Sequence, residues 1–125
     1  KLVDQRTFAP SPQTPGEAAL SRSLLPADPA ARLRPADPAP DWRATLDAVA
    51  QQALARDPGA QFEVMAPIPT AQSRAVQDQF ARDGLADAQT VAAALRADGI
   101  APARISIGYV GDAGKPAREV RLYVR

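Results

Sequence analysis

Arginines gather in the last part of the chain, where two short strands are expected. They are Arg104, Arg118, Arg121 and Arg125. Side chains alternate between the two faces of a strand, so Arg121 points away from the apolar face of its strand. A strip of guanidinium groups can bind an anionic ligand. It also suits an edge strand, where charge discourages pairing with another sheet. We favour edge protection over anion binding.

Carboxylates occupy the middle of the chain. They are Glu63, Asp78, Asp83, Asp87 and Asp98. Asp83 and Asp87 are four residues apart, a spacing that places both on one side of a helix. Such a pair can act as an acid pair or hold a hard cation. Acids in the first turn of a helix, favoured by its dipole, give the same pattern. We favour this structural interpretation and predict no metal site.

The chain contains no histidine and no cysteine. This excludes the Ser-His-Asp and Cys-His nucleophiles, thiolate metal sites and most zinc sites. The segment "GYVGDAG" at 108–114 lacks the following helix and the spacing of a phosphate-binding loop. We interpret it as a hairpin turn with a solvated Lys115. The sequence therefore predicts no catalytic residue, no cofactor and a protein that is not an enzyme.

The composition of the chain argues against two classes of partner, nucleic acids and membranes. The net charge is +1 and aromatic residues make up 5% of the chain. A net charge this small produces no strong electrostatic attraction for nucleic acid or an anionic membrane. Few aromatic side chains are present on which bases could stack. No apolar run approaches the roughly 18 residues of a membrane-spanning helix. We expect neither nucleic acid nor direct membrane insertion.

Proline divides the chain near Asp41, since eight of the 13 prolines precede that residue. Proline removes a backbone donor and restricts its predecessor, which prevents long helices and central strands. We predict an extended arm or tether over residues 1–40 that contributes little to stability, and one folded domain over residues 41–125. Residues 18–25 could hold a helical turn or a short strand. A disordered tail and an arm packed on the domain both remain open.

The first helix is predicted from Asp41, as its N-cap, to the "DPG" at 57–59. Its apolar stripe begins at Trp42, which we interpret as an anchor for the arm rather than a platform for a sugar. The alternation over residues 61–68 predicts a strand ended by its prolines.

A short helix ending at Gly84 is then predicted, followed by a stronger helix that starts at Leu85. Its apolar residues recur at helical spacing, and Gly99 stands where a left-handed cap is expected. The pair could also be a single helix. Alternating residues predict the last two strands, at 104–110 and 118–125.

A short loop joins the last two strands, so we expect them to pair antiparallel. The strand at 61–68 is separated from them by helix and should lie parallel to one of them. The predicted fold is an α/β (α+β) two-layer sandwich with a mixed sheet, helices on one face and an extended arm in front.

Four motifs carry a family resemblance. "DAQTVAAAL" fits a helix pattern L-x-x-x-R-A-x-x-V-x-x-x-L, and "LRADGI" fits the exit of that helix. "RISIGYVGDAGKP" and "AREVRLYV" fit the strand, turn and final strand that follow. Over residues 42–125 the chain thus resembles the OmpA-like C-terminal domain, the peptidoglycan-associating module of Gram-negative envelopes. The resemblance also implies a strand before the first helix, here within the arm and short or absent.

The chain departs from this family at its ligand site. The loop "APIPTAQS" lacks the family's Asp, and Asp87 stands where the helix Arg should meet a diaminopimelate carboxylate. Ala117 and Glu119 replace two residues of the N-R-R-V motif, while Arg118 and Val120 keep their types. Asp87 would repel an anionic ligand. Arg118 is therefore the one candidate binding residue.

The resemblance implies a non-enzymatic interaction or scaffold module of the cell envelope, with an envelope protein as partner. A peptidoglycan-binding domain with a relocated site is the alternative. "KLVDQRTFAPSPQTPG" is similar to the tether of envelope lipoproteins, whose lipid-bearing Cys would stand just before Lys1. A chain trimmed at Lys1 is the other interpretation. We expect a periplasmic location, with any outer-membrane anchoring through that lipid.

Overall fold

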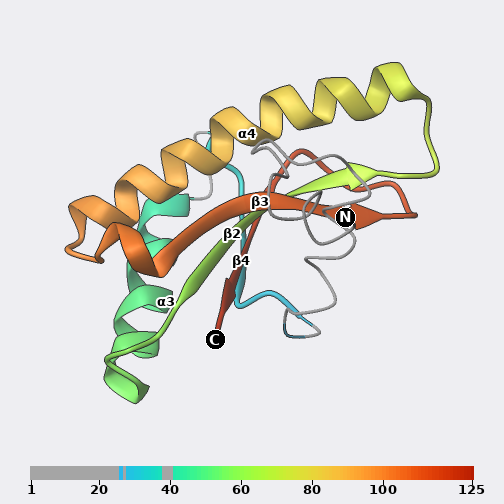
Figure 1. Cartoon of the computed structure of the whole chain (residues 1–125). Helices are drawn as coiled ribbons and strands as arrows, with labels where there is room; N and C mark the ends of the chain where they lie inside the picture. Colours follow the sequence, from blue (N-terminus) through green and yellow to red (C-terminus); the bar gives the residue numbers. More distant parts are fainter. Residues whose placement is uncertain (1–25, 27, 38–40) are drawn as a thin grey trace, which may run out of the picture.

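The structure, a computed structural model, describes residue 26, residues 28–37 and residues 41–125. The expectation for residues 18–25 lies outside this part of the chain. The elements follow one another as β1 (Ala31–Leu33), α3 (Trp42–Arg56), β2 (Phe62–Pro69), α4 (Arg74–Ala97), the short 3₁₀ helix η1 (Pro102–Arg104), β3 (Ile105–Asp112) and β4 (Val120–Val124). Together they form an open four-stranded mixed sheet packed with two α-helices (Figure 1).

The first predicted helix is confirmed as α3. The Asp41 carboxylate caps it by accepting hydrogen bonds from the backbone N–H groups of Arg43, at 3.1 Å, and Ala44, at 3.3 Å. These bonds satisfy donors that the first helical turn leaves without partners. Leu46 and Ala50, one turn apart, are buried against the sheet.

The two helices predicted on either side of Gly84 are one continuous helix, α4. Gly84 does not end a helix, because its role is a close approach to the sheet. A Cβ atom at this position would lie 2.5 Å from the Cβ of Ala66 on β2. The absence of a side chain therefore lets α4 rest directly on the central strand.

The end of α4 follows the sequence prediction. Gly99 has a φ of 97°. The N–H of Gly99 donates to the carbonyl of Arg96, and the N–H of Ile100 donates to the carbonyl of Leu95. This pair of bonds is the Schellman motif, in which a glycine in the left-handed region ends the helix. Ile100 is buried just beyond it.

The strand order is β1-β4-β2-β3, which contradicts the predicted hairpin. β4 does not pair with β3. It lies between β1 and β2 and is antiparallel to both, while β3 lies parallel to β2 on the far side. Residues 113–119 thus cross the end of β2 instead of making a tight turn. The expectation that the strand at 61–68 lies parallel to one of the last two strands is confirmed.

The prolines predicted to end β2 lie inside it. β2 pairs with β3 along its whole length to Pro69, but with β4 only from Phe62 to Met65. Gln61 and Arg125 exchange both backbone hydrogen bonds, so alternate residues from Gln61 onward direct their backbone groups to β4. The missing N–H of Pro67 therefore faces the side where pairing with β4 has already stopped.

β1 lies in the range that we expected to be an arm. Its residues pair with β4, from Ala31 opposite Leu122 to Leu33 opposite Val120. Leu33 is 1% exposed and belongs to the main core. The packed domain therefore includes a strand of three residues upstream of residue 41, in the range where we expected a strand to be short or absent.

One face of the sheet and both helices enclose the main core. Phe62 and Val64 of β2 pack with Leu46 of α3 and with Val91 and Leu95 of α4. Alternation along β4 is as predicted, with Val120 and Leu122 on this face. The fold is thus mixed α and β, with helices on one side of an open sheet.

Candidate functional site

Arg118, the one binding residue predicted from the sequence, forms a two-point ion pair with Asp87. Its Nε lies 2.8 Å from Asp87 Oδ2 and its Nη2 lies 3.0 Å from Oδ1. Arg118 stands just before β4 and its side chain is 47% exposed, whereas the Asp87 side chain on α4 is 9% exposed. The carboxylate thus presents both oxygens to the planar guanidinium, the strongest geometry for such a pair.

This contact gives Asp87 a role that the sequence did not reveal. Its carboxylate occupies the position on Arg118 where a carboxylate ligand would bind. The hydrogen bonds that the Arg118 guanidinium donates to Asp87 raise the pKa of Arg118 above its ordinary value. A ligand carboxylate would have to displace this buried acid from Arg118.

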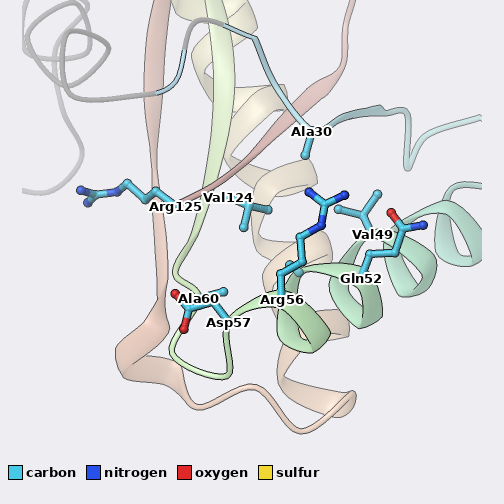
Figure 2. Close-up of a pocket in the computed structure, with 9 residues that line it drawn as sticks. Ala30, Val49, Gln52, Arg56, Asp57, Ala60, Val124 and Arg125 are labelled. Atoms are coloured by element: carbon cyan, nitrogen blue, oxygen red, sulfur yellow. The ribbon is translucent and has the colours of Figure 1, made fainter.

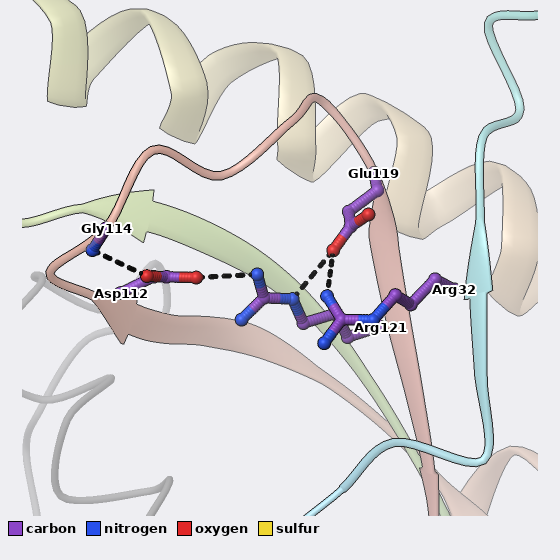
Figure 3. Close-up of polar contacts among 5 residues, drawn as sticks. All are labelled: Arg32, Asp112, Gly114, Glu119 and Arg121. Carbon is purple, nitrogen blue, oxygen red and sulfur yellow. Dashed lines mark hydrogen bonds and ion pairs between the residues drawn. The ribbon is translucent and has the colours of Figure 1, made fainter.

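A second ion-pair network lies on the face of the sheet opposite the helices (Figure 3). Arg121 donates to Glu119 at 2.8 Å and to Asp112 at 2.7 Å. Arg32 of β1 donates to the same Glu119 oxygen at 2.6 Å. Asp112 also accepts from the backbone N–H of Gly114 at 2.8 Å, which shapes the bend after β3. Arg121 and Glu119 are both almost fully buried.

The expected edge-protecting role of Arg121 is wrong, because β4 is an inner strand. Burial alone would lower the pKa of Arg121, but hydrogen bonds to Glu119 and Asp112 outweigh it and the pKa lies above its ordinary value. Arg121 is thus a buried charge that two carboxylates neutralise. Its pairs connect β4 to the loop and to β3.

The remaining arginines of the expected strip also have partners within the molecule. Arg125 donates two hydrogen bonds to Glu63, the shorter at 2.8 Å. Arg104 donates to the backbone carbonyl of Pro58. The structure therefore does not bring these arginines together into one anion-binding surface.

Asp83 and Asp87, the two acids considered as a pair from their spacing, have different partners. Asp83 accepts from Gln79 at 3.0 Å, while Asp87 turns to Arg118. Their assignment to a first helical turn is wrong, because α4 begins at Arg74 and has no acid in its first turn. In the part of the chain that the structure describes, no three potential metal-ligating residues cluster.

Sequence reasoning missed a cluster that joins α3 to the end of α4. Arg43 donates to Asp98 at 2.9 Å and to Asp47 at 3.3 Å. A hydrogen bond with Asp98 raises the pKa of the Asp47 carboxyl, while the same bond and Arg43 lower the pKa of Asp98. Asp47 is thus the acid that keeps its proton to higher pH. The two acids are far apart in the sequence, so only the fold reveals them.

Replacing Asp98 by asparagine is expected to lower the pKa of Asp47. The substitution removes the carboxylate that favours the protonated form, while Arg43 still favours the ionised one. The pH dependence of the Asp47 carboxyl carbon shift in NMR spectra measures this change. Asp83→Asn, on the far part of α4, serves as the matched control. An unchanged pKa in Asp98→Asn would show that the two acids are not coupled.

A groove of about 320 Å³ lies between the end of α3 and the sheet (Figure 2). Ala30, Val49, Ala53, Ala60 and Val124 supply its apolar lining. Gln52, Arg56, Asp57 and Arg125 add polar groups, and Arg56 reaches across the opening in the close-up (Figure 2). Arg56 and Asp57 carry opposite charges, while the Arg125 side chain points away from the groove toward its partner Glu63 (Figure 2).

Trp42 is partly buried against the main core, as its place on the apolar stripe predicted. Its indole thus has a packing role within the domain.

Over the described residues, no helix is long and apolar enough to cross a membrane.

The charged side chains described above pair with one another within the molecule. Among the described residues, every buried side-chain nitrogen or oxygen has a hydrogen-bond partner.

A scan against protein-family models finds none that matches this chain. A search of the curated proteins also finds no match.

Proposed function

We propose that this protein is a non-enzymatic interaction module of the cell envelope, a divergent OmpA-like domain that no longer holds peptidoglycan in the family's manner. Its partner is an envelope protein, and its location is periplasmic, through a lipoprotein-type tether or as a subunit of an envelope complex. The ion pair between Arg118 and Asp87 carries the proposal.

The order of elements supports the likeness to this family. The resemblance implies a strand before the first helix, then a strand, a helix and two final strands. The chain has β1, α3, β2, α4, β3 and β4 in that order. A fold alone does not assign a function, so the argument depends on the site.

The site supports loss of the family's ligand. The retained Arg118 is bound at two points by Asp87, the residue that replaces the family's helix Arg. A peptidoglycan carboxylate would compete with this internal carboxylate and be repelled by it. Like charges about 4 Å apart repel by about 1–4 kcal/mol between water and a protein surface, which is enough to abolish a weak site.

Co-sedimentation with purified peptidoglycan sacculi tests the proposal. We expect the wild-type protein to stay in the supernatant, and Arg118→Ala to behave in the same way. Asp87→Ala frees Arg118 without adding a new charge, so partial recovery of binding is expected only if the rest of the family site persists. Arg96→Ala, at an exposed position of α4, is the matched control for loss of an arginine.

Two outcomes contradict the proposal. If wild type co-sediments and Arg118→Ala abolishes this, the family site is intact despite the ion pair. If wild type and Arg118→Ala both co-sediment, the chain binds peptidoglycan through a relocated site. Circular dichroism of each variant confirms that the fold is retained.

A further inference from the structure

The two edges of the sheet differ in how well they are protected from pairing. β1 is three residues long, carries the charged Arg32 and is flanked by Pro29 and Pro35. Short length, charge and proline are the features that protect an edge strand. β3 is eight residues long, and its sequence "ISIGYVGD" has no proline and no charge before Asp112. Before Asp112, β3 therefore has neither the short length, the charge nor the proline that protects β1.

The register shows which backbone groups of β3 face outward. The carbonyl of Asp112 accepts from Thr70 on the side of β2. Alternate residues back along the strand, Val110, Gly108 and Ser106, face the same way, because a strand residue directs its N–H and C=O to one side. Ile105, Ile107 and Tyr109 therefore direct their backbone groups away from β2.

These outward groups form a short, defined set. The N–H of Ile105 is already bonded to the carbonyl of Pro102. Within the described parts of the chain, no partner is seen for the carbonyl of Ile105 or for both backbone groups of Ile107 and Tyr109. The edge thus offers one isolated acceptor at its start and donors and acceptors at the next two outward residues.

We propose that two copies of this chain pair antiparallel through the outer edges of β3, about a twofold axis at Ile107. The two Ile107 residues then exchange both of their backbone hydrogen bonds. Each Tyr109 N–H meets the Ile105 carbonyl of the second copy. The pairing uses the isolated acceptor and does not need the Ile105 donor that is already occupied. The pairing ends at Tyr109 and involves no backbone group of Gly111 or Asp112.

The side chains along this edge are compatible with such a pair. Ile107 lies opposite Ile107 of the second copy, and Ile105 lies opposite Tyr109, so apolar side chains meet on the helix face. Ser106 lies opposite Gly108 on the other face, where both side chains are small. No like charges are opposed. Ile105 and Ile107 are only partly buried in one copy, so pairing buries more of their surface.

The contact is small, so a weak and concentration-dependent dimer is expected. Sedimentation velocity of the full chain from about 20 µM to about 1 mM should show a rising average sedimentation coefficient. Ser106→Lys places a charge at an exposed edge position and should weaken association at least about fivefold. Ala93→Lys adds the same charge at an exposed position of α4 and should leave association unchanged.

A single-cysteine series identifies the axis, because the chain has no cysteine of its own. In a hydrogen-bonded antiparallel pair the Cα atoms are about 5.5 Å apart, within the range that a disulfide spans. Ile107→Cys should therefore crosslink to itself under mild oxidation, well above the background set by Ala93→Cys.

The proposal is overturned if wild type stays monomeric at the highest concentration. It is also overturned if both lysine variants weaken association equally, or if Ile107→Cys crosslinks no more than Ala93→Cys while remaining folded. Should Ile107→Cys fail to fold, the lysine pair decides, because Ser106 is exposed and contributes no side chain to the core.

Discussion

Replacing Leu33 by alanine is expected to lower the free energy of unfolding by about 2–5 kcal/mol, the usual cost of truncating a buried leucine. Leu33 is 1% exposed and packs in the main core from β1. Its loss leaves a cavity beside Val120, its partner across the strands. Urea unfolding of the full chain, followed by circular dichroism, measures the change.

Arg34→Ala is the matched control for this prediction. Arg34 is the next residue and is exposed, and its side chain makes no hydrogen bond within the described part of the chain. Its replacement should therefore change stability by less than about 0.5 kcal/mol. Removal of residues 1–40 should cost at least as much as Leu33→Ala, because the whole of β1 is lost. Equal stability of Leu33→Ala and wild type would mean that the sequence-based expectation of a dispensable arm is right after all.

The helices were well predicted because their signals are local. Asp41 and Gly99 act within one turn of the ends that they mark. Gly84 misled the prediction because the same residue type has two uses. A glycine inside a helix costs about 1 kcal/mol relative to alanine. Here that cost is offset by close contact of α4 with Ala66, a partner that no local pattern reveals.

The strand order could not be derived from the residues alone. The alternation of Val120, Leu122 and Val124 identified a strand and its buried face. It does not identify which strands pair with it on either side. β3 and β4 are two strand spacings apart, about 10 Å, and residues 113–119 are long enough to cross β2 over that distance. β1 was hidden for another reason, since three residues between prolines give almost no periodic signal.

The candidate site depends on pairs of distant charges. The sequence marked Arg118 as the one candidate binding residue. Its partner Asp87 is 31 positions away and stood out in the sequence only because a carboxylate replaces the family's Arg. Asp47 and Asp98 are likewise joined only by the packing of α3 against the end of α4. The sequence shows the charge of each residue. The residue that neutralises this charge can be identified only once the topology is known.

Leu95→Ala is expected to be as damaging as the change at Leu33, with a loss of about 2–5 kcal/mol in the free energy of unfolding. Leu95 is fully buried, and α4 holds it against the strands in the same core. Its backbone carbonyl also accepts the bond from Ile100 that closes the helix end, and alanine keeps this bond. The expected loss therefore comes from the missing side-chain atoms alone. Denaturant unfolding measures the loss, with the adjacent exposed Arg96→Ala as control. A cost below about 1 kcal/mol for Leu95→Ala would mean that the core collapses around the missing atoms or that α4 does not pack on the sheet as described.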